Sequence, residues 1–128
     1  MIAAVIRPVR VSDLAYVTDS WAKNDHEYRK VRTSVAVSAI RERLAGDRVE
    51  IRVATLPDDE DAILGWAVVT PPNDRSAIVH YVYVRRDARL QGVARALLSD
   101  LEGADVVYQA FPPMHARLPK CWRRVDHV

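Results

Sequence analysis

Residues 77–101 constrain the fold most, because an apolar run leads directly through a basic, glycine-containing turn into a helical pattern. Residues 77–84 are typical of a buried strand and are interrupted by His80. The turn has the sequence Arg-Leu-Gln-Gly-Val-Ala at residues 89–94. The first amides of a helix have no partner within it and carry partial positive charge. The pattern therefore predicts an anion-binding loop, and an ordinary strand–helix connection with solvated arginines is the alternative.

The same stretch resembles a known coenzyme signature. Residues 83–98 resemble the acetyl-CoA signature of the GCN5-related N-acetyltransferase (GNAT) superfamily, which is Gln or Arg, two residues, Gly, one residue, then Gly or Ala. Arg89, Gly92 and Ala94 occupy its fixed positions, and Leu90 stands where many members have a further glycine. Through its shortness, and through residues 19–21 and 64–66, the chain also resembles acetyltransferase-like proteins of bacteriophages and prophages.

Length and composition predict a single domain over residues 1–128. The chain is 49% hydrophobic and 28% charged, as is ordinary for a soluble globular protein. No apolar stretch approaches the ~20 residues that cross a bilayer, and the N-terminus lacks the pattern of a signal peptide. Cys121 is a lone cysteine, which favours a cytoplasmic location. No Cys/His cluster has metal-ligand spacing, and the net charge of +2 gives little support to nucleic-acid binding.

The spacing of apolar residues predicts the order β-α-α-β-β-β-α-β. The predicted elements are a strand at 5–9, a helix from 13, a helix from 34 to Gly46, strands at 48–54, 63–70 and 76–84, a helix at 93–101 and a strand at 105–111. In the strand at 48–54 charged residues alternate with apolar ones, as on a half-buried strand, so Glu50 is expected on its solvated face. Turns are predicted at 57–61 and 71–74.

This order resembles that of the GNAT fold, an α/β (α+β) fold whose mixed central sheet is flanked by helices. The C-terminal part is shorter than in most members of the superfamily. A chain shortened in this way could complete its sheet with a partner chain, so a homodimer is one expectation.

The resemblance implies acetyl-CoA as co-substrate. Main-chain groups at Val82, Tyr83 and Val84 would bond the pantetheine arm and polarise the thioester carbonyl. Amides of the turn would hold the diphosphate, and the strand at 105–111 would diverge to leave a wedge for the coenzyme. The residues implied at the turn are Arg89, Leu90, Gln91, Gly92, Val93, Ala94 and Arg95.

Two side chains are candidates for proton transfer. His80 is expected to alternate with Ile78, Val82 and Val84 on one strand face, and imidazole side chains titrate near neutral pH. Some arylalkylamine members of the superfamily carry a histidine at this distance before the signature. The alternative is a histidine in a polar niche beside the sheet. Tyr108 is the candidate acid for the leaving thiolate, with packing as its alternative, because residues 112–128 lack the tyrosine that usually has this role.

The loop between the first two helices lines the acceptor side in GNAT proteins. Here Tyr28, Arg29 and Lys30 make that loop basic and aromatic, and a solvated loop is the alternative. The predicted function is N-acetyl transfer from acetyl-CoA to a primary amine by direct attack in a ternary complex. A non-catalytic binding protein of the same fold, and a phage-type modifier of nucleic acid or of a nucleic-acid-binding protein, are the alternatives.

Overall fold

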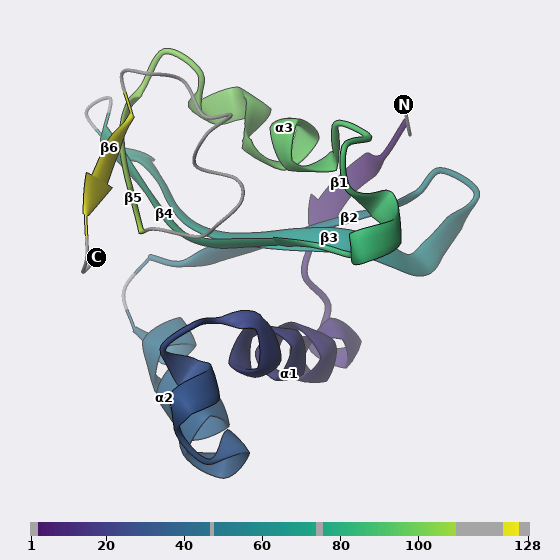
Figure 1. Ribbon diagram of the computed structural model, residues 1–128. Coiled ribbons are helices and arrows are strands. Elements are labelled where there is room, and N and C mark those ends of the chain that lie inside the picture. The colour runs from purple at the N-terminus through teal and green to yellow at the C-terminus, as the bar shows by residue number, and fades with distance from the viewer. Residues whose placement is uncertain (1–2, 47, 74–75, 110–121, 126–128) are drawn as a thin grey trace. The chain divides into compact units, whose positions relative to one another are not determined.

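A computed structural model describes residues 3–46, 48–73, 76–109 and 122–125 (Figure 1). The chain forms two compact units. A helical unit comprises Val9–Val49, and a sheet unit comprises Met1–Pro8 together with Glu50–Val128. The helical unit is therefore inserted into the connection between the first two strands of the sheet.

The helical unit contains two α-helices that pack against each other. Its elements are η1 (Val11–Asp13), α1 (Leu14–Asn24), η2 (Tyr28–Lys30) and α2 (Thr33–Ala45). Both α-helices lie close to their predicted positions. The loop predicted between them contains the 3-10 helix η2, which at three residues is too short to be predicted from apolar periodicity. In the described residues, every helix is too short or too polar to span a bilayer.

In the part of the chain that the structure describes, the sheet unit contains a mixed sheet of six strands in the spatial order β1-β2-β3-β4-β5-β6. The strands are β1 (Val5–Pro8), β2 (Glu50–Leu56), β3 (Asp59–Asn73), β4 (Ser76–Val84), β5 (Asp105–Gln109) and β6 (Arg123–Val125). Strands β1 to β4 pair with one another in antiparallel fashion, whereas β5 pairs in parallel with both β4 and β6. The mixed α+β fold predicted from the sequence is confirmed.

Strand β3 extends beyond its predicted bounds at both ends. Residues 59–61 and 71–73 belong to the strand and not to the turns expected at 57–61 and 71–74. Residues 58–60 are exposed. A hairpin arm with exposed side chains does not need apolar alternation, which explains why the pattern missed it. Strand β6 was also missed, because three residues are too few to show a period.

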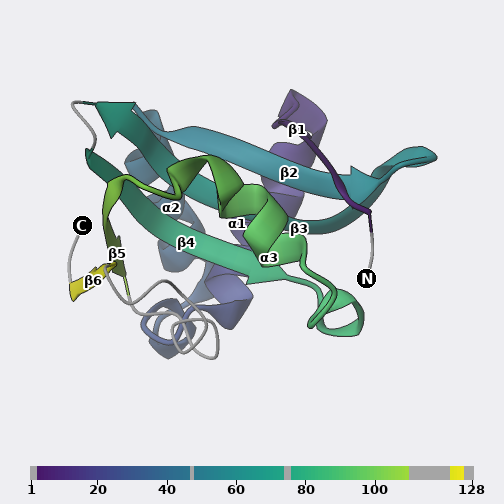
Figure 2. The ribbon, with the colours of Figure 1, turned by 90° about the horizontal axis from the view of Figure 1, so that it is seen from above.

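One helix, α3 (Val93–Leu98), continues into η4 (Ser99–Leu101) and covers one face of the sheet (Figure 2). It contacts β2, β3 and β4 through buried side chains, which include Val93, Leu97 and Leu101. This is the helix predicted at 93–101.

The α3 side of β2 was predicted wrongly. The alternation at 48–54 predicted a solvated face for the charged residues, but Arg52 is 7% exposed and donates a hydrogen bond to the Leu97 carbonyl of α3. Arg52 pairs with Ala67, which pairs with Val82, so these three residues mark the face that α3 covers. A charged side chain on an alternating strand usually faces water, and the sequence of β2 alone does not reveal the helix that covers it.

Candidate active site

Strand β4 carries a β-bulge at His80. Val68 of β3 pairs with Tyr81, and the next residue, Val69, pairs with Val79, so His80 is the additional residue on β4. A bulge interrupts the regular alternation of side chains and bends the strand that contains it. The faces of β4 must therefore be assigned separately on the two sides of His80.

The bulge places His80 on the face opposite α3. Trp66, Val68 and Thr70 alternate on that face of β3, and their partners on β4 are Tyr83, Tyr81 and Ile78 respectively. His80 shares this face, because its Nε2 lies 2.8 Å from Oγ1 of Thr70. Val82 and Val84 pair with Ala67 and Gly65 and lie on the α3 face. The predicted alternation of His80 with Val82 and Val84 is therefore wrong.

The ladder between β4 and β5 stops next to this bulge. Pairing runs from Ser76–Asp105 to Val79–Tyr108. Beyond it β4 continues to Val84, whereas Gln109, the last residue of β5, pairs with Val125 of β6. Within the described residues, β5 therefore pairs with the first half of β4. Residues 110 and 111 of the predicted strand lie outside the described residues.

The turn after β4 is fixed to the end of the sheet. The Arg85 amide donates to the Leu64 carbonyl (2.8 Å), and Nε of Arg89 donates to the Val84 carbonyl (3.1 Å). Between them lies η3 (Arg86–Ala88). These bonds hold the end of β4 and the start of the turn together.

The backbone of the turn reaches α3 through left-handed conformations. Leu90 has φ 66° and Gly92, the N-cap of α3, has φ 83°. Glycine adopts such a φ readily, whereas a side chain there costs about 1–2 kcal/mol. Gly92 has no side chain to cap α3, and the amides of Val93, Ala94 and Arg95 have no acceptor within the helix.

Residues 14–106, well over half of the chain, match the sequence model of the acetyltransferase (GNAT) family. This chain belongs to that family. The GNAT acetyltransferase is consequently an acyltransferase that depends on acetyl-CoA. No curated protein matches the sequence significantly.

Solved structures of low sequence identity share the fold of this GNAT acetyltransferase. The aminoglycoside N-acetyltransferase AAC(6')-Iy, in complex with the bisubstrate analogue CoA-S-monomethyl-acetylneamine, is 13% identical, with a TM-score of 0.64 over 98% of this chain and 97% of that chain. A possible acetyltransferase from Clostridium difficile 630 is 17% identical, with a TM-score of 0.61 over 89% and 84%. Ribosomal-protein-alanine N-acetyltransferase from Brucella melitensis biovar Abortus 2308 is 18% identical, with a TM-score of 0.57 over 90% and 86%.

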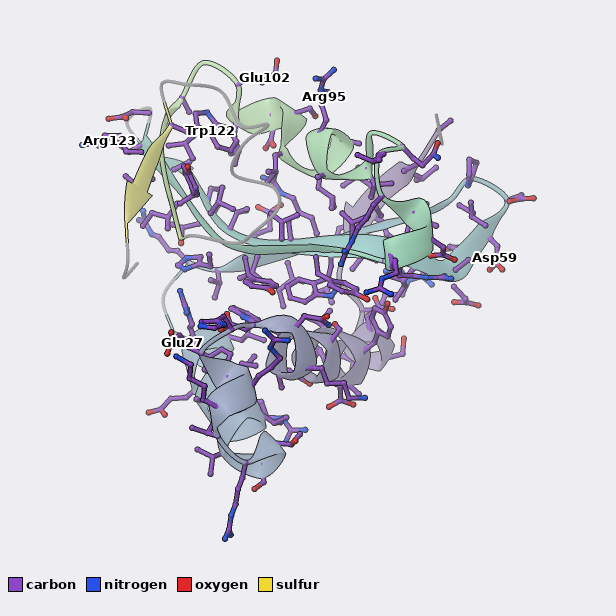
Figure 3. The ribbon with its side chains drawn as sticks, in the orientation of Figure 1. Glu27, Asp59, Arg95, Glu102, Trp122 and Arg123 are labelled. Atoms are coloured by element: carbon purple, nitrogen blue, oxygen red, sulfur yellow. The ribbon has the colours of Figure 1, made fainter. Side chains whose placement is uncertain are left out.

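The residues of the turn suit the diphosphate of this co-substrate. An anion at a helix N-terminus is bound by main-chain N–H groups, and Gly92 keeps side-chain atoms away from the backbone that would approach it. Arg89 and Leu90 are exposed, the latter at 72%. Arg95 is exposed as well and points away from the sheet (Figure 3). The charges near the turn are therefore available to solvent and to a charged ligand.

The two candidate catalytic side chains of the GNAT acetyltransferase lie on opposite faces of the sheet. Tyr108 is 7% exposed and pairs with Val79, so it belongs to the α3 face, whereas His80 belongs to the other face. Thr70, the hydrogen-bond partner of His80, was not predicted as a site residue. Nothing in the local sequence distinguishes it from any other strand threonine.

The candidate acceptor residues Tyr28, Arg29 and Lys30 form η2 of the helical unit. The Asp25 carboxylate accepts bonds from the Tyr28 amide (3.3 Å) and the Trp21 indole (3.2 Å). The Tyr28 ring packs edge-on against Trp21 at 6.2 Å between centroids. Lys30 forms an exposed ion pair with Glu27 at 3.4 Å (Figure 3 labels Glu27). Asp25, which the sequence analysis missed, therefore fixes the start of η2.

Proposed function

We propose that this acetyltransferase moves an acetyl group from acetyl-CoA to a primary amine by direct attack within a ternary complex. One observation carries the proposal: in the described residues the β4–β5 pairs reach as far as Val79, next to the His80 bulge, and the same strand leads into the turn at Gly92. The end of β4, which offers a strand edge to the thioester, is thus followed directly in the chain by the turn, which offers amide donors to the diphosphate. Holding two reactants in alignment supplies effective molarities of roughly 10⁵ M or more.

The coenzyme-binding roles fall on the end of β4 and on the turn. Main-chain groups of Val82, Tyr83 and Val84 orient the pantetheine arm and polarise the carbonyl of the bound thioester. The amides from Gln91 to Arg95, with the charges of Arg89 and Arg95, hold the diphosphate. When bound, acetyl-CoA supplies an acyl carbon that a neutral amine can attack. Donors fixed in advance stabilise the charge that develops on the acyl oxygen.

His80 accepts the proton that the amine loses, directly or through a water. It is 8% exposed, and the bulge that presents it begins directly after the last β4–β5 pair. A neutral imidazole can take a proton near physiological pH. The bond to Thr70 limits the orientations of the ring. Tyr108 lies on β5 and on the opposite face of the sheet, so it would donate a proton to the leaving thiolate from the α3 side. Tyr108→Phe tests this role through the rate of CoA release.

The acceptor side is assigned to Tyr28, Arg29 and Lys30. Arg29 and Lys30 are exposed cations on one turn of helix, and they favour an acceptor that carries negative charge beside its amine. Substitution of both by glutamine should raise KM for such an acceptor and leave the affinity for acetyl-CoA unchanged.

The coenzyme site is tested by calorimetry on Gly92→Glu and on a matched control, Gly103→Glu. Both glycines have nearly the same left-handed φ, 83° and 85°, so both variants bear the same backbone strain and the same added charge. Only Gly92→Glu places that charge at the turn, and it should abolish binding of acetyl-CoA. If both variants bind acetyl-CoA like the parent, the coenzyme site is assigned wrongly.

The order of the reaction is tested by initial rates on a panel of amines. Direct attack in a ternary complex predicts double-reciprocal plots that intersect. Parallel lines would indicate an acetylated enzyme intermediate and would contradict the proposed mechanism.

A further inference from the structure

Arg52 is a buried cation on β2, the second strand in the spatial order of the sheet. It lies on β2 between Pro8 of β1 and Ala67 of β3 and is 7% exposed. A buried charge is costly unless it is paired and hydrogen-bonded. Its position therefore requires a set of partners.

Three residues supply those partners. Nη1 donates to the Leu97 carbonyl at 3.0 Å, and Nε donates to Oε1 of Glu50 at 3.0 Å. The two terminal nitrogens bind the two carboxylate oxygens of Asp100, and the bond from Nη2 is 2.7 Å long. Burial acts to lower the pKa of Arg52, but the hydrogen bonds and charges of Asp100 and Glu50 outweigh it and raise that pKa. The guanidinium stays charged and forms a bidentate pair.

Two of the three partners lie at the C-terminal end of the helix that follows the turn. Leu97 belongs to the last turn of α3, and Asp100 belongs to η4. The last carbonyls of a helix lack hydrogen-bond donors within it and carry partial negative charge. A cation at this end can both donate to those carbonyls and balance their charge. Arg52 thus anchors this end of α3 to β2.

Anchoring matters because α3 is short. It has six residues, and isolated helices below about 12 residues are marginal in water. At its other end the helix follows the turn that Arg89 ties to the Val84 carbonyl. The position of its first amides therefore depends on attachments at both ends.

We propose that Arg52 is a positioning residue for acetyl-CoA, which fixes the C-terminal end of α3 and thereby the diphosphate-binding amides at the opposite end. The proposal rests on the coenzyme site proposed above. The amides of Val93 to Arg95 lie about 3–6 Å along the helix from Leu97, at a rise of about 1.5 Å per residue. Misplacement of a binding group by about 1 Å can cost as much as 100-fold in rate, so a small tilt of α3 is enough to be measured.

The test compares Arg52→Met and Arg52→Lys with a matched control, Val53→Ala. Val53 is the next residue on β2, is fully buried and lies on the opposite face, because it pairs with Trp66. Calorimetry with acetyl-CoA is done well below the unfolding temperature of every variant. Arg52→Met should weaken acetyl-CoA binding by on the order of tenfold. Arg52→Lys keeps the charge but cannot form the bidentate pair with Asp100, and it should weaken binding by less than about tenfold. Val53→Ala should lose stability yet bind acetyl-CoA like the parent.

Kinetics and hydrogen exchange separate positioning from general stability. In Arg52→Lys, KM for acetyl-CoA should rise while KM for the amine stays within about twofold. Relative to the parent protein, the amides of α3 should show a larger increase in exchange rate than the amides of β3. If Arg52→Met does not fold, Asp100→Asn takes its place, because the Asp100 side chain is 55% exposed and is lost at lower cost.

The inference is overturned if the Arg52 variants bind acetyl-CoA as tightly as Val53→Ala does. That result would make Arg52 a structural residue alone. If Gly92→Glu also retained binding, the coenzyme site itself would be at fault. If Gly92→Glu lost binding while Arg52→Met kept it, only the role of Arg52 would fail.

Discussion

Substituting alanine for Gly65 should push two central strands apart. Gly65 lies on β3 between Ala54 of β2 and Val84 of β4. A Cβ at this position would lie 2.5 Å from the Tyr83 carbonyl oxygen and 3.2 Å from the Val84 Cα. Both of these atoms belong to the backbone, so no side-chain rotation can relieve the contact.

The magnitude follows from that distance. Carbon and carbonyl oxygen normally approach to about 3.3 Å, so β4 would have to move by about 0.8 Å. Overpacking of this kind costs about 1–3 kcal/mol, and occasionally more, while the gain from a less flexible unfolded chain is below about 1 kcal/mol. Because both close contacts are with backbone atoms, we expect the upper end of that cost and a net loss of about 2 kcal/mol, which corresponds to a fall in Tm of roughly 7 °C. Activity should fall further, because Tyr83 and Val84 are proposed to bind the coenzyme.

Urea denaturation of Gly65→Ala and Gly103→Ala measures this cost. At Gly103 an added Cβ meets nothing within 4 Å, so that variant bears only the strain of its left-handed φ of 85°, about 1 kcal/mol. Gly65→Ala should therefore have the lower midpoint. If Gly65→Ala is as stable as Gly103→Ala, β4 can move away from residue 65 at little cost in free energy, and the packing argument is wrong.

Further predictions concern single side chains. His80→Gln should lower kcat by about 100-fold or more with unchanged binding of acetyl-CoA, and an unaltered kcat would exclude His80 as proton acceptor. Thr70→Val should lower kcat by about tenfold, whereas Thr70→Ser, which keeps the hydroxyl, should not. Leu90→Gly should stabilise the fold by about 0.5–1 kcal/mol in urea denaturation, and a loss would mean that the leucine side chain packs. Asp25→Ala should cost about 2–3 kcal/mol and alter Trp21 fluorescence, and an unchanged spectrum would argue against that contact.

The sequence predicted the elements that have a clear apolar period and a residue that marks one end. The helix after the turn was predicted within its observed bounds, because Gly92 marks the start and apolar residues recur every three or four positions. The divergence of the strand at 105–111 from β4, which the resemblance implies, stays a prediction.

Features that depend on the register between strands escaped sequence analysis. The bulge at His80 lies inside a continuous apolar run, where both faces are buried and an extra residue leaves no trace in the hydrophobic pattern. For the same reason the pairing of His80 with Thr70 could not be foreseen. Arg52 escaped because an alternating strand appears half-solvated until the helix that covers it is known.

The insertion of the helical unit between β1 and β2 has a consequence for how this enzyme can change. Pro8 and Arg52 are paired across those strands, so Val9–Val49 leaves and re-enters the sheet at neighbouring points. Lengthening a connection with fixed ends costs little, since each doubling adds only about 0.6 kcal/mol. All the candidate acceptor residues lie on this inserted segment, and all the candidate acetyl-CoA residues lie outside it. Evolution or an engineer can therefore replace the segment that carries the candidate acceptor residues and leave the candidate acetyl-CoA residues unchanged.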